Sequence, residues 1–344
     1  MRRIRRTLPL VLLVAACTPS QKPGAPPPAA VALPVVIQGA NLRPVEDERR
    51  GYGTKTARLT MQRLRKLGVN TISVLMEGRM RAVDDPRIQT PDRDEIDAVH
   101  QALLDANEMG FATVLVPHIY IADGTWRGRI ELGDDELRED WWASYETFIG
   151  QAAGVAAATG TSMLSIGVEL RALSAQPDTN RRMRRLAANV RRDYAGALTY
   201  HANWDEAESV AFWEAVDFAG VNGYYPLLPD PIRGAEINAR RLTTLSRIAE
   251  RPVVVLEVGY RSSPLSHVKP WAWPDEVEPL VDHPSQARAW AAVLTHWLHA
   301  EGVRGLLVWV VPTDPDDPAS EPAHGFNPLN KPAEQVIGRV FSNE

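Results

Sequence analysis

Two glutamates stand at the ends of apolar, β-branched runs, where carboxylates are unusual. Glu169 follows the run 165–168, Ser-Ile-Gly-Val, and Glu257 follows the run 253–256, Val-Val-Val-Leu. A carboxylate at the end of a buried strand costs free energy unless it is hydrogen-bonded or takes part in chemistry. Either glutamate alone could instead be a rim residue paired with an arginine. A pair held about 5 Å apart has the geometry of retaining glycoside hydrolysis, in which one carboxyl protonates the leaving oxygen and the other attacks the anomeric carbon.

The elements that must position this pair alternate between short β-branched runs and amphipathic helical stretches. The chain has 344 residues, 44% of them hydrophobic and 24% charged, which is enough apolar material for a large globular core. Eight strands are predicted, at 35–39, 69–76, 112–117, 162–167, 198–202, 218–222, 252–256 and 305–310. Between two of them, Trp290, Val293, Leu294 and Trp297 form one apolar helical stripe.

Eight strand–helix units in about 310 residues predict the α/β class and a single (β/α)8 TIM barrel. An open doubly wound sheet is the alternative, but no glycine-rich phosphate-binding motif follows the first strand. In a barrel, functional side chains gather at the C-terminal ends of the strands. Strands four and seven face each other across this opening, so Glu169 and Glu257 are expected to share one pocket.

Five segments, two of which contain these glutamates, carry a family resemblance and follow in the family's order between residues 165 and 334. They are Ser165–Leu170; Ala202–Asp205; Phe212–Phe218 with Val221–Leu227; Leu256–Ser262; and Gly325–Pro328 with Lys331–Glu334. With glutamates ending strands four and seven, the chain resembles glycoside hydrolase family 113, within the large clan that includes cellulases and β-mannanases. The resemblance implies Glu169 as acid/base and Glu257 as nucleophile. It also implies hydrolysis of β-1,4-mannan or a related β-glycan, without a metal or cofactor.

Val168 departs from the family pattern. The family usually carries Asn or Thr just before the acid/base, whereas a valine offers no hydrogen bond. The departure leaves open an altered substrate, weak activity, or a non-catalytic glycan-binding lipoprotein on a degenerate barrel. A metal-dependent deacetylase is a further alternative, but the sequence has no clustered His and Asp ligands for it.

Polar and aromatic residues near the other strand ends are candidates for sugar binding. The predicted set is Asn41, His118, Asn203, Trp204, Asn222, Tyr224 and Trp309. The resemblance implies that a tyrosine after strand six touches the nucleophile, and either Tyr224 or Tyr225 fits, with Tyr224 preferred.

Other residues near the strand ends have two readings. Trp126, Trp271 and Trp273 lie in loops, where their indoles could wall a cleft or only pack the loops down. Glu77 and Arg79, after strand two, could bind hydroxyls or simply pair with each other.

The N-terminus is typical of a bacterial lipoprotein. Residues 1–16 form a signal peptide with a basic start and a short apolar run, ending in Val-Ala-Ala before Cys17, the predicted lipidation site. Residues 17–34 are rich in Pro and Ala, a composition that predicts a flexible tether. The barrel is then expected to span residues 35–344. We therefore expect a monomer anchored through Cys17 in the cell envelope, at the outer membrane or cell surface, with a polysaccharide or oligosaccharide as substrate. The net charge of −5 argues against nucleic-acid binding.

Overall fold

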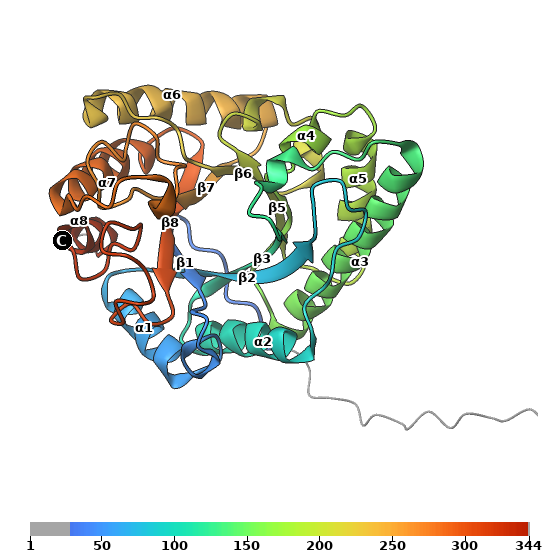
Figure 1. The fold of residues 1–344 in the computed structure, drawn as a ribbon, viewed down its shortest axis with the longest axis horizontal. Helices are drawn as coiled ribbons and strands as arrows, with labels where there is room; N and C mark the ends of the chain where they lie inside the picture. The colour runs from blue at the N-terminus through green and yellow to red at the C-terminus, as the bar shows by residue number, and fades with distance from the viewer. Residues whose placement is uncertain (1–27, 343–344) are drawn as a thin grey trace, which may run out of the picture.

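The computed structural model describes residues 28–342, which form one closed barrel of eight parallel strands (Figure 1). The strands are β1 (Ile37–Arg43), β2 (Thr71–Met80), β3 (Ala112–Ile121), β4 (Met163–Val168), β5 (Ala197–Asn203), β6 (Phe218–Asn222), β7 (Val253–Val258) and β8 (Val303–Pro312). Each strand pairs with the next along the chain, and β8 pairs with β1. All eight predicted strands and the single TIM barrel are confirmed.

Helices surround the barrel and cover its outer face (Figure 1). They are α1 (Lys55–Lys66), α2 (Arg93–Glu108), α3 (Asp135–Thr159), α4 (Arg171–Ser174), α5 (Thr179–Val190), α6 (Pro231–Ala249), α7 (His283–Trp297) and α8 (Pro332–Phe341), with short 3-10 turns in the loops. The predicted stripe on α7, from Trp290 to Trp297, is fully buried, as the helical spacing of its apolar residues predicts.

Strand alternation divides the core into an inner and an outer layer. On β7, Val254 and Leu256 belong to one cluster of buried residues, while Val253 and Val255 belong to the cluster that packs against the helices. Successive strand side chains point to opposite faces, so the first cluster fills the barrel interior. Glu257, the penultimate residue of β7, follows Leu256 where the pairing of β7 with both neighbouring strands shifts register. The shift interrupts the alternation, and Glu257 lines the cavity at this end of the barrel.

The sheet is uneven around its circumference. The β2–β3 pair runs for ten residues, from Thr71 beside Ala112 to Met80 beside Ile121. In contrast, β3 and β4 pair only at Val114–Met163 and Leu115–Leu164. Beyond this point β3 continues without β4, so its backbone groups need other partners at the end where the active-site loops lie.

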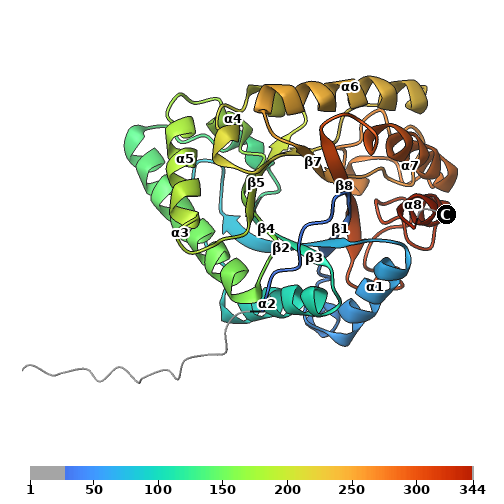
Figure 2. The same ribbon diagram turned by 180° about the vertical axis from the view of Figure 1, so that it is seen from behind.

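The chain before β1 crosses the opposite end of the barrel (Figure 2). Ser162 Oγ donates to the Val31 carbonyl at 2.6 Å, and Arg304 donates to the carbonyls of Pro34 and Val35. Contacts with the barrel thus begin before the predicted boundary at residue 35. The predicted signal peptide, Cys17 and most of the tether lie outside the described residues.

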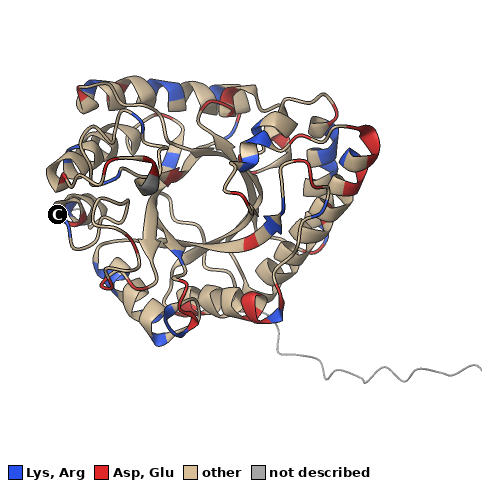
Figure 3. Ribbon diagram, viewed as in Figure 1, with Lys and Arg blue, Asp and Glu red and all other residues tan. Residues whose placement is uncertain are grey.

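Charged residues lie mainly on the outer helices and loops, with both signs on α3 and only basic residues on α5 (Figure 3). Among residues 28–342, no helix is long and apolar enough to span a membrane.

Candidate active site

A cavity of about 490 Å³ opens at the C-terminal ends of the strands and receives both glutamates. Its walls come from strand ends and from the loops after β3, β5, β7 and β8. They consist of His118, Tyr120, Trp126, Arg127, Arg129, Glu169, Asn203, Trp204, Asp205, Tyr224, Glu257, Trp271, Trp273, Glu276, Trp309 and Phe326. Glu169 and Glu257 therefore line the same pocket, as the sequence predicted.

Glu169 sits immediately after β4 in an unusual backbone conformation. Its φ is +49°, in the left-handed region that non-glycine residues seldom adopt. The Glu169 amide donates to the His201 carbonyl of β5 at 2.7 Å, which fixes this turn. Strained residues of this kind concentrate at functional sites, where the surrounding structure holds them in place.

Three donors surround the Glu169 carboxylate, which is only 6% exposed. Oε2 accepts from Trp126 Nε1 at 2.7 Å and from Arg127 Nη1 at 2.6 Å. Oε1 accepts from Asn222 Nδ2 at 3.0 Å. Burial raises the pKa of Glu169, while Arg127 opposes that rise because it favours the charged form.

Glu257 has far fewer partners. Tyr224 donates its hydroxyl to Oε2 at 3.1 Å, and Oε1 has no hydrogen-bond partner among the described residues. Glu257 lies beside Asn222 in the β6–β7 register, so the residue that donates to Glu169 is also the neighbour of Glu257. Tyr225, the other tyrosine considered, is fully buried against Trp204 and Trp297, so Tyr224 is the one that contacts Glu257.

His201 is a buried neighbour of the pair that the sequence did not single out. It lies on β5 with no exposed surface, and its Nδ1 is 3.9 Å from Glu257 Oε1. Burial lowers the pKa of His201 to about 3, so the ring is neutral at ordinary pH. A single histidine within an apolar strand does not indicate from the sequence alone that it lies beside the two glutamates.

Arg127 ties the β3 side of the cavity to Glu169. Its Nε donates to the Ile119 carbonyl at 2.9 Å, on the part of β3 that β4 leaves unpaired. Its Nη2 lies 2.6 Å from His118 Nε2. A guanidinium can only donate, so a ring nitrogen of His118 accepts, which requires a neutral ring. Burial holds the pKa of His118 well below its usual range, in agreement with a neutral ring.

Most of the predicted binding residues line the cavity, and two do not. His118, Asn203, Trp204, Tyr224 and Trp309 form part of its wall. Asn222 is fully buried and contacts Glu169 instead. Asn41 is also fully buried, and its Nδ2 donates to the carbonyls of Leu256 and Val308. An amide committed to backbone carbonyls of β7 and β8 supports the strands, so Asn41 does not take the predicted position in the sugar-binding wall.

The loop tryptophans turn inward. Trp204 and Trp271 stack with ring centroids 5.6 Å apart and planes 19° apart, and Trp273 packs edge-on against Phe326. Trp271 and Trp273 line the cavity and remain 44% and 43% exposed. Flat indole faces of this kind are suited to stacking against sugar rings.

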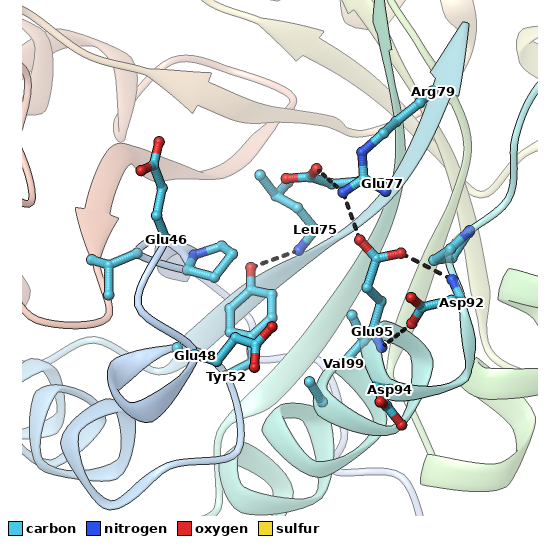
Figure 4. Close-up of a pocket in the computed structure, with 15 residues that line it drawn as sticks. Glu46, Glu48, Tyr52, Leu75, Glu77, Arg79, Asp92, Asp94, Glu95 and Val99 are labelled. Atoms are coloured by element: carbon cyan, nitrogen blue, oxygen red, sulfur yellow. Dashed lines mark hydrogen bonds and ion pairs between the residues drawn. The ribbon is translucent and has the colours of Figure 1, made fainter.

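A second cavity, of about 530 Å³, lies beside β2 and the start of α2 (Figure 4). Arg79 pairs there with Glu77 at 3.1 Å and with Glu95 at 2.6 Å, and Glu95 also caps α2 with Asp92. Glu77 and Arg79 therefore pair with each other, one of the two alternatives considered for them. Glu95 and Asp92 cap the helix, and Glu77 and Glu95 pair with Arg79. These carboxylates are therefore not held as a pair like Glu169 and Glu257 in the first cavity.

The charge on Glu257 should cost stability. Burial raises the pKa of Glu257 from 4.5 to about 7. A carboxyl with a higher pKa in the folded state binds its proton more tightly there, so this group's contribution to stability falls as the pH rises from 4.5 to about 7. We expect Glu257→Gln to raise the free energy of unfolding by up to about 3 kcal/mol at pH 8 and to change it little at pH 4.

Urea unfolding of the wild type and the variant at the two pH values measures this difference. Glu301→Gln, at an exposed ion pair with Arg247, is the control. It should change the free energy of unfolding by the same small amount at pH 4 and at pH 8. A stability gain for Glu257→Gln that is as large at pH 4 as at pH 8 would contradict the argument.

A closed (β/α)8 barrel with two buried carboxylates at the ends of β4 and β7 is the framework of a glycoside hydrolase. The chain belongs to glycoside hydrolase family 113, whose family model matches residues 45–325. It is thus a glycoside hydrolase, as the motifs predicted. Within the described residues, no group of three or more His, Cys, Asp or Glu side chains is arranged to hold a metal ion.

Solved structures agree with this assignment. The family 113 β-mannanase AaManA from Alicyclobacillus acidocaldarius, in complex with ManMIm, is 29% identical, with a TM-score of 0.79 over 92% of this chain and 99% of that one. A second family 113 β-1,4-mannanase is 21% identical, with a TM-score of 0.79 over 90% and 99%. A family 5 enzyme from Streptomyces cattleya bound to Manβ1-4GlcNAc shares the fold, at 15% identity and a TM-score of 0.62 over 89% and 80%. Among proteins with curated descriptions, none matches.

Proposed function

We propose that this protein is a retaining glycoside hydrolase that cleaves β-1,4-mannan or a related β-glycan by double displacement. Glu169 is the acid/base and Glu257 is the nucleophile. The observation that carries the proposal is the shared cavity, into which β4 and β7 bring two buried carboxylates among sugar-stacking aromatic side chains. The mannanase activity named for two family 113 relatives supports the choice of substrate.

In the first half-reaction, the ionised Glu257 attacks the anomeric carbon and the glycosidic C–O bond breaks. The leaving oxygen takes the proton from Glu169, and a glycosyl ester forms on Glu257. The Tyr224 hydroxyl supports the charged form of Glu257 through its hydrogen bond to Oε2. Burial favours the protonated form of Glu169 that this step needs.

In the second half-reaction, a water loses a proton to Glu169 and attacks the same carbon, and the ester bond to Glu257 breaks. Glu169 must be a carboxylate at this stage. Trp126, Arg127 and Asn222 donate to its oxygens and stabilise that form. The surroundings of Glu169 thus suit a residue that is an acid in one step and a base in the next.

Incubation of the purified chain with β-1,4-mannan tests the function. We expect release of reducing ends, with the first product detected by proton NMR in the β configuration, because two displacements retain the stereochemistry. Glucomannan, xylan and cellulose in parallel define the preferred backbone. An initial α product would exclude the retaining mechanism, and binding without any product would instead favour the glycan-binding alternative.

We further propose that the protein acts as a monomer anchored to the cell envelope through a lipid on Cys17. The charged start, the short apolar run and the sole cysteine at its end support this location.

A further inference from the structure

The loop after β3 places two arginines beside the carboxyl that acts on the leaving group. Arg127 donates to Glu169 Oε2 at 2.6 Å and forms no hydrogen bond to Glu257 in the described part of the chain. In the proposed function, on which this inference rests, Glu169 protonates the oxygen that joins the cleaved sugar to its leaving group. The Arg127 guanidinium therefore lies on the leaving-group side of the scissile bond.

Both oxygens of Glu169 accept hydrogen bonds from other residues of the protein. Oε2 accepts from Trp126 and Arg127, and Oε1 accepts from Asn222. To donate a proton, one oxygen must become an O–H group directed at the leaving oxygen, and an N–H donor aimed at the same position opposes it. Asn222 is fixed on β6, whereas Trp126 and Arg127 belong to a loop, so Oε2 is the oxygen that must exchange partners.

When Glu169 is protonated, Arg127 keeps only neutral partners within hydrogen-bond distance. These are the His118 ring and the Ile119 carbonyl. The Arg127 side chain is 13% exposed, and a cation this far from solvent is costly without an anion in contact. Three of its five N–H groups donate to Ile119, Glu169 and His118, and two have no partner among the described residues.

Arg129 adds a second positive charge to the same wall. It lines the cavity and is exposed, and it forms no ion pair with any side chain that the structure describes. Two other acids of the cavity have partners of their own. Asp205 pairs with Arg171 at 3.3 Å, and Glu276 accepts the backbone N–H of Trp273 at 2.8 Å.

We propose that Arg127 and Arg129 form a receptor for a carboxylate on the leaving-group sugar, so that the enzyme prefers β-glycans with a hexuronic acid at that position. A planar carboxylate matches the paired N–H groups of a guanidinium. It takes the place of Glu169 as the anionic partner of Arg127 and frees Oε2 to carry the catalytic proton. A neutral sugar at the same position leaves Arg127 without an anion in contact.

A matched pair of substrates tests this preference. The first is a polymer of alternating β-linked mannose and glucuronic acid, and the second is the same polymer after chemical reduction of its carboxyls to hydroxymethyl groups. We expect kcat/KM of the wild type to be about tenfold or more higher on the acidic polymer, and the ratio to shrink at high salt. A ratio near one, or an equal gain from a neutral backbone carrying sulfate, would overturn the proposal.

Variants assign the preference to the receptor. Arg127→Gln should bring the ratio between the two polymers close to one, whatever its effect on the absolute rates. Arg129→Gln, at an exposed position, should lower the ratio without disturbing the fold. The control is Arg93→Gln at the start of α2, which removes one exposed positive charge away from the cavity and should leave the ratio unchanged. Retention of the full ratio in both cavity variants would contradict the assignment.

Binding separates this inference from the proposed function. Calorimetry on the Glu257→Gln chain measures Kd for acidic and carboxyl-reduced oligosaccharides of the same length, without turnover. Tighter binding of the acidic form, lost on adding Arg127→Gln, supports the receptor even if the wild type cleaves neither polymer, a result that would refute only the hydrolase proposal. Cleavage of neutral mannan with equal binding of the two oligosaccharides would refute only the receptor.

Discussion

Replacement of Glu257 by alanine is expected to lower kcat on β-glycans by on the order of 10⁴-fold or more, because the variant lacks the carboxylate that forms the glycosyl ester. Its carboxylate is buried, lines the cavity and accepts one hydrogen bond, from Tyr224. Initial rates of reducing-end release measure the loss.

Azide distinguishes a lost nucleophile from a disrupted pocket. In Glu257→Ala, azide can enter the vacated space and attack the anomeric carbon from the same side, so rescued activity should give an α-glycosyl azide. The matched control is Glu77→Gln, a carboxylate near the end of β2 in the neighbouring cavity, whose activity should stay within about twofold of the wild type. Full activity in Glu257→Ala, or rescue that gives a β-glycosyl azide, would remove Glu257 from the nucleophile role.

Replacement of Glu169 by alanine should give a different pattern. General acid catalysis is worth about 10²–10⁴-fold, so hydrolysis of polysaccharide should fall by that factor. A substrate with an activated aryl leaving group needs little protonation, so formation of its glycosyl-enzyme should be much less affected. The second half-reaction still lacks a base, and a burst of released phenol followed by slow turnover is therefore expected.

Azide again identifies the role. In Glu169→Ala, azide needs no general base and should attack the glycosyl-enzyme from the opposite side to Glu257, giving a β-glycosyl azide. The alkaline limb of the pH profile of kcat/KM should also disappear, because it reports loss of the acid's proton. An equal loss on aryl and polysaccharide substrates, with no azide product, would contradict the assignment of Glu169.

Val168 raised the question of whether this barrel is a degenerate binder. In the structure Val168 is 2% exposed and packs in the interior cluster that also contains Tyr224 and Trp309. Its apolar side chain gives no hydrogen bond to the cavity. Hydrogen bonds to Glu169 come from Asn222 on β6 and from the loop after β3, so the carboxylate does not depend on position 168. What Val168 removes is a hydrogen bond to the sugar, which bears on the substrate and the rate.

The sequence by itself determined the barrel and the two carboxylates. Strand and helix periodicity are local properties, so eight β-branched runs separated by amphipathic stretches were sufficient to predict eight strands and their order. The positions of Glu169 and Glu257 followed for the same reason, since each ends a run whose burial is evident from its composition. A closed parallel barrel then brings the ends of all strands to one face, whatever the path of the loops.

The tertiary structure alone decided how the side chains around this pair are used. Tyr224 and Tyr225 are adjacent and extended residues point alternately, so the β6–β7 pairing, with its register shift between Val221 and Asn222, determines which one reaches Glu257. The Arg127 contact joins residues 42 positions apart, through a loop that enters where β4 stops pairing with β3. Contacts of this kind depend on the length of each strand pair and on the course of a loop, and no local pattern of residues encodes either.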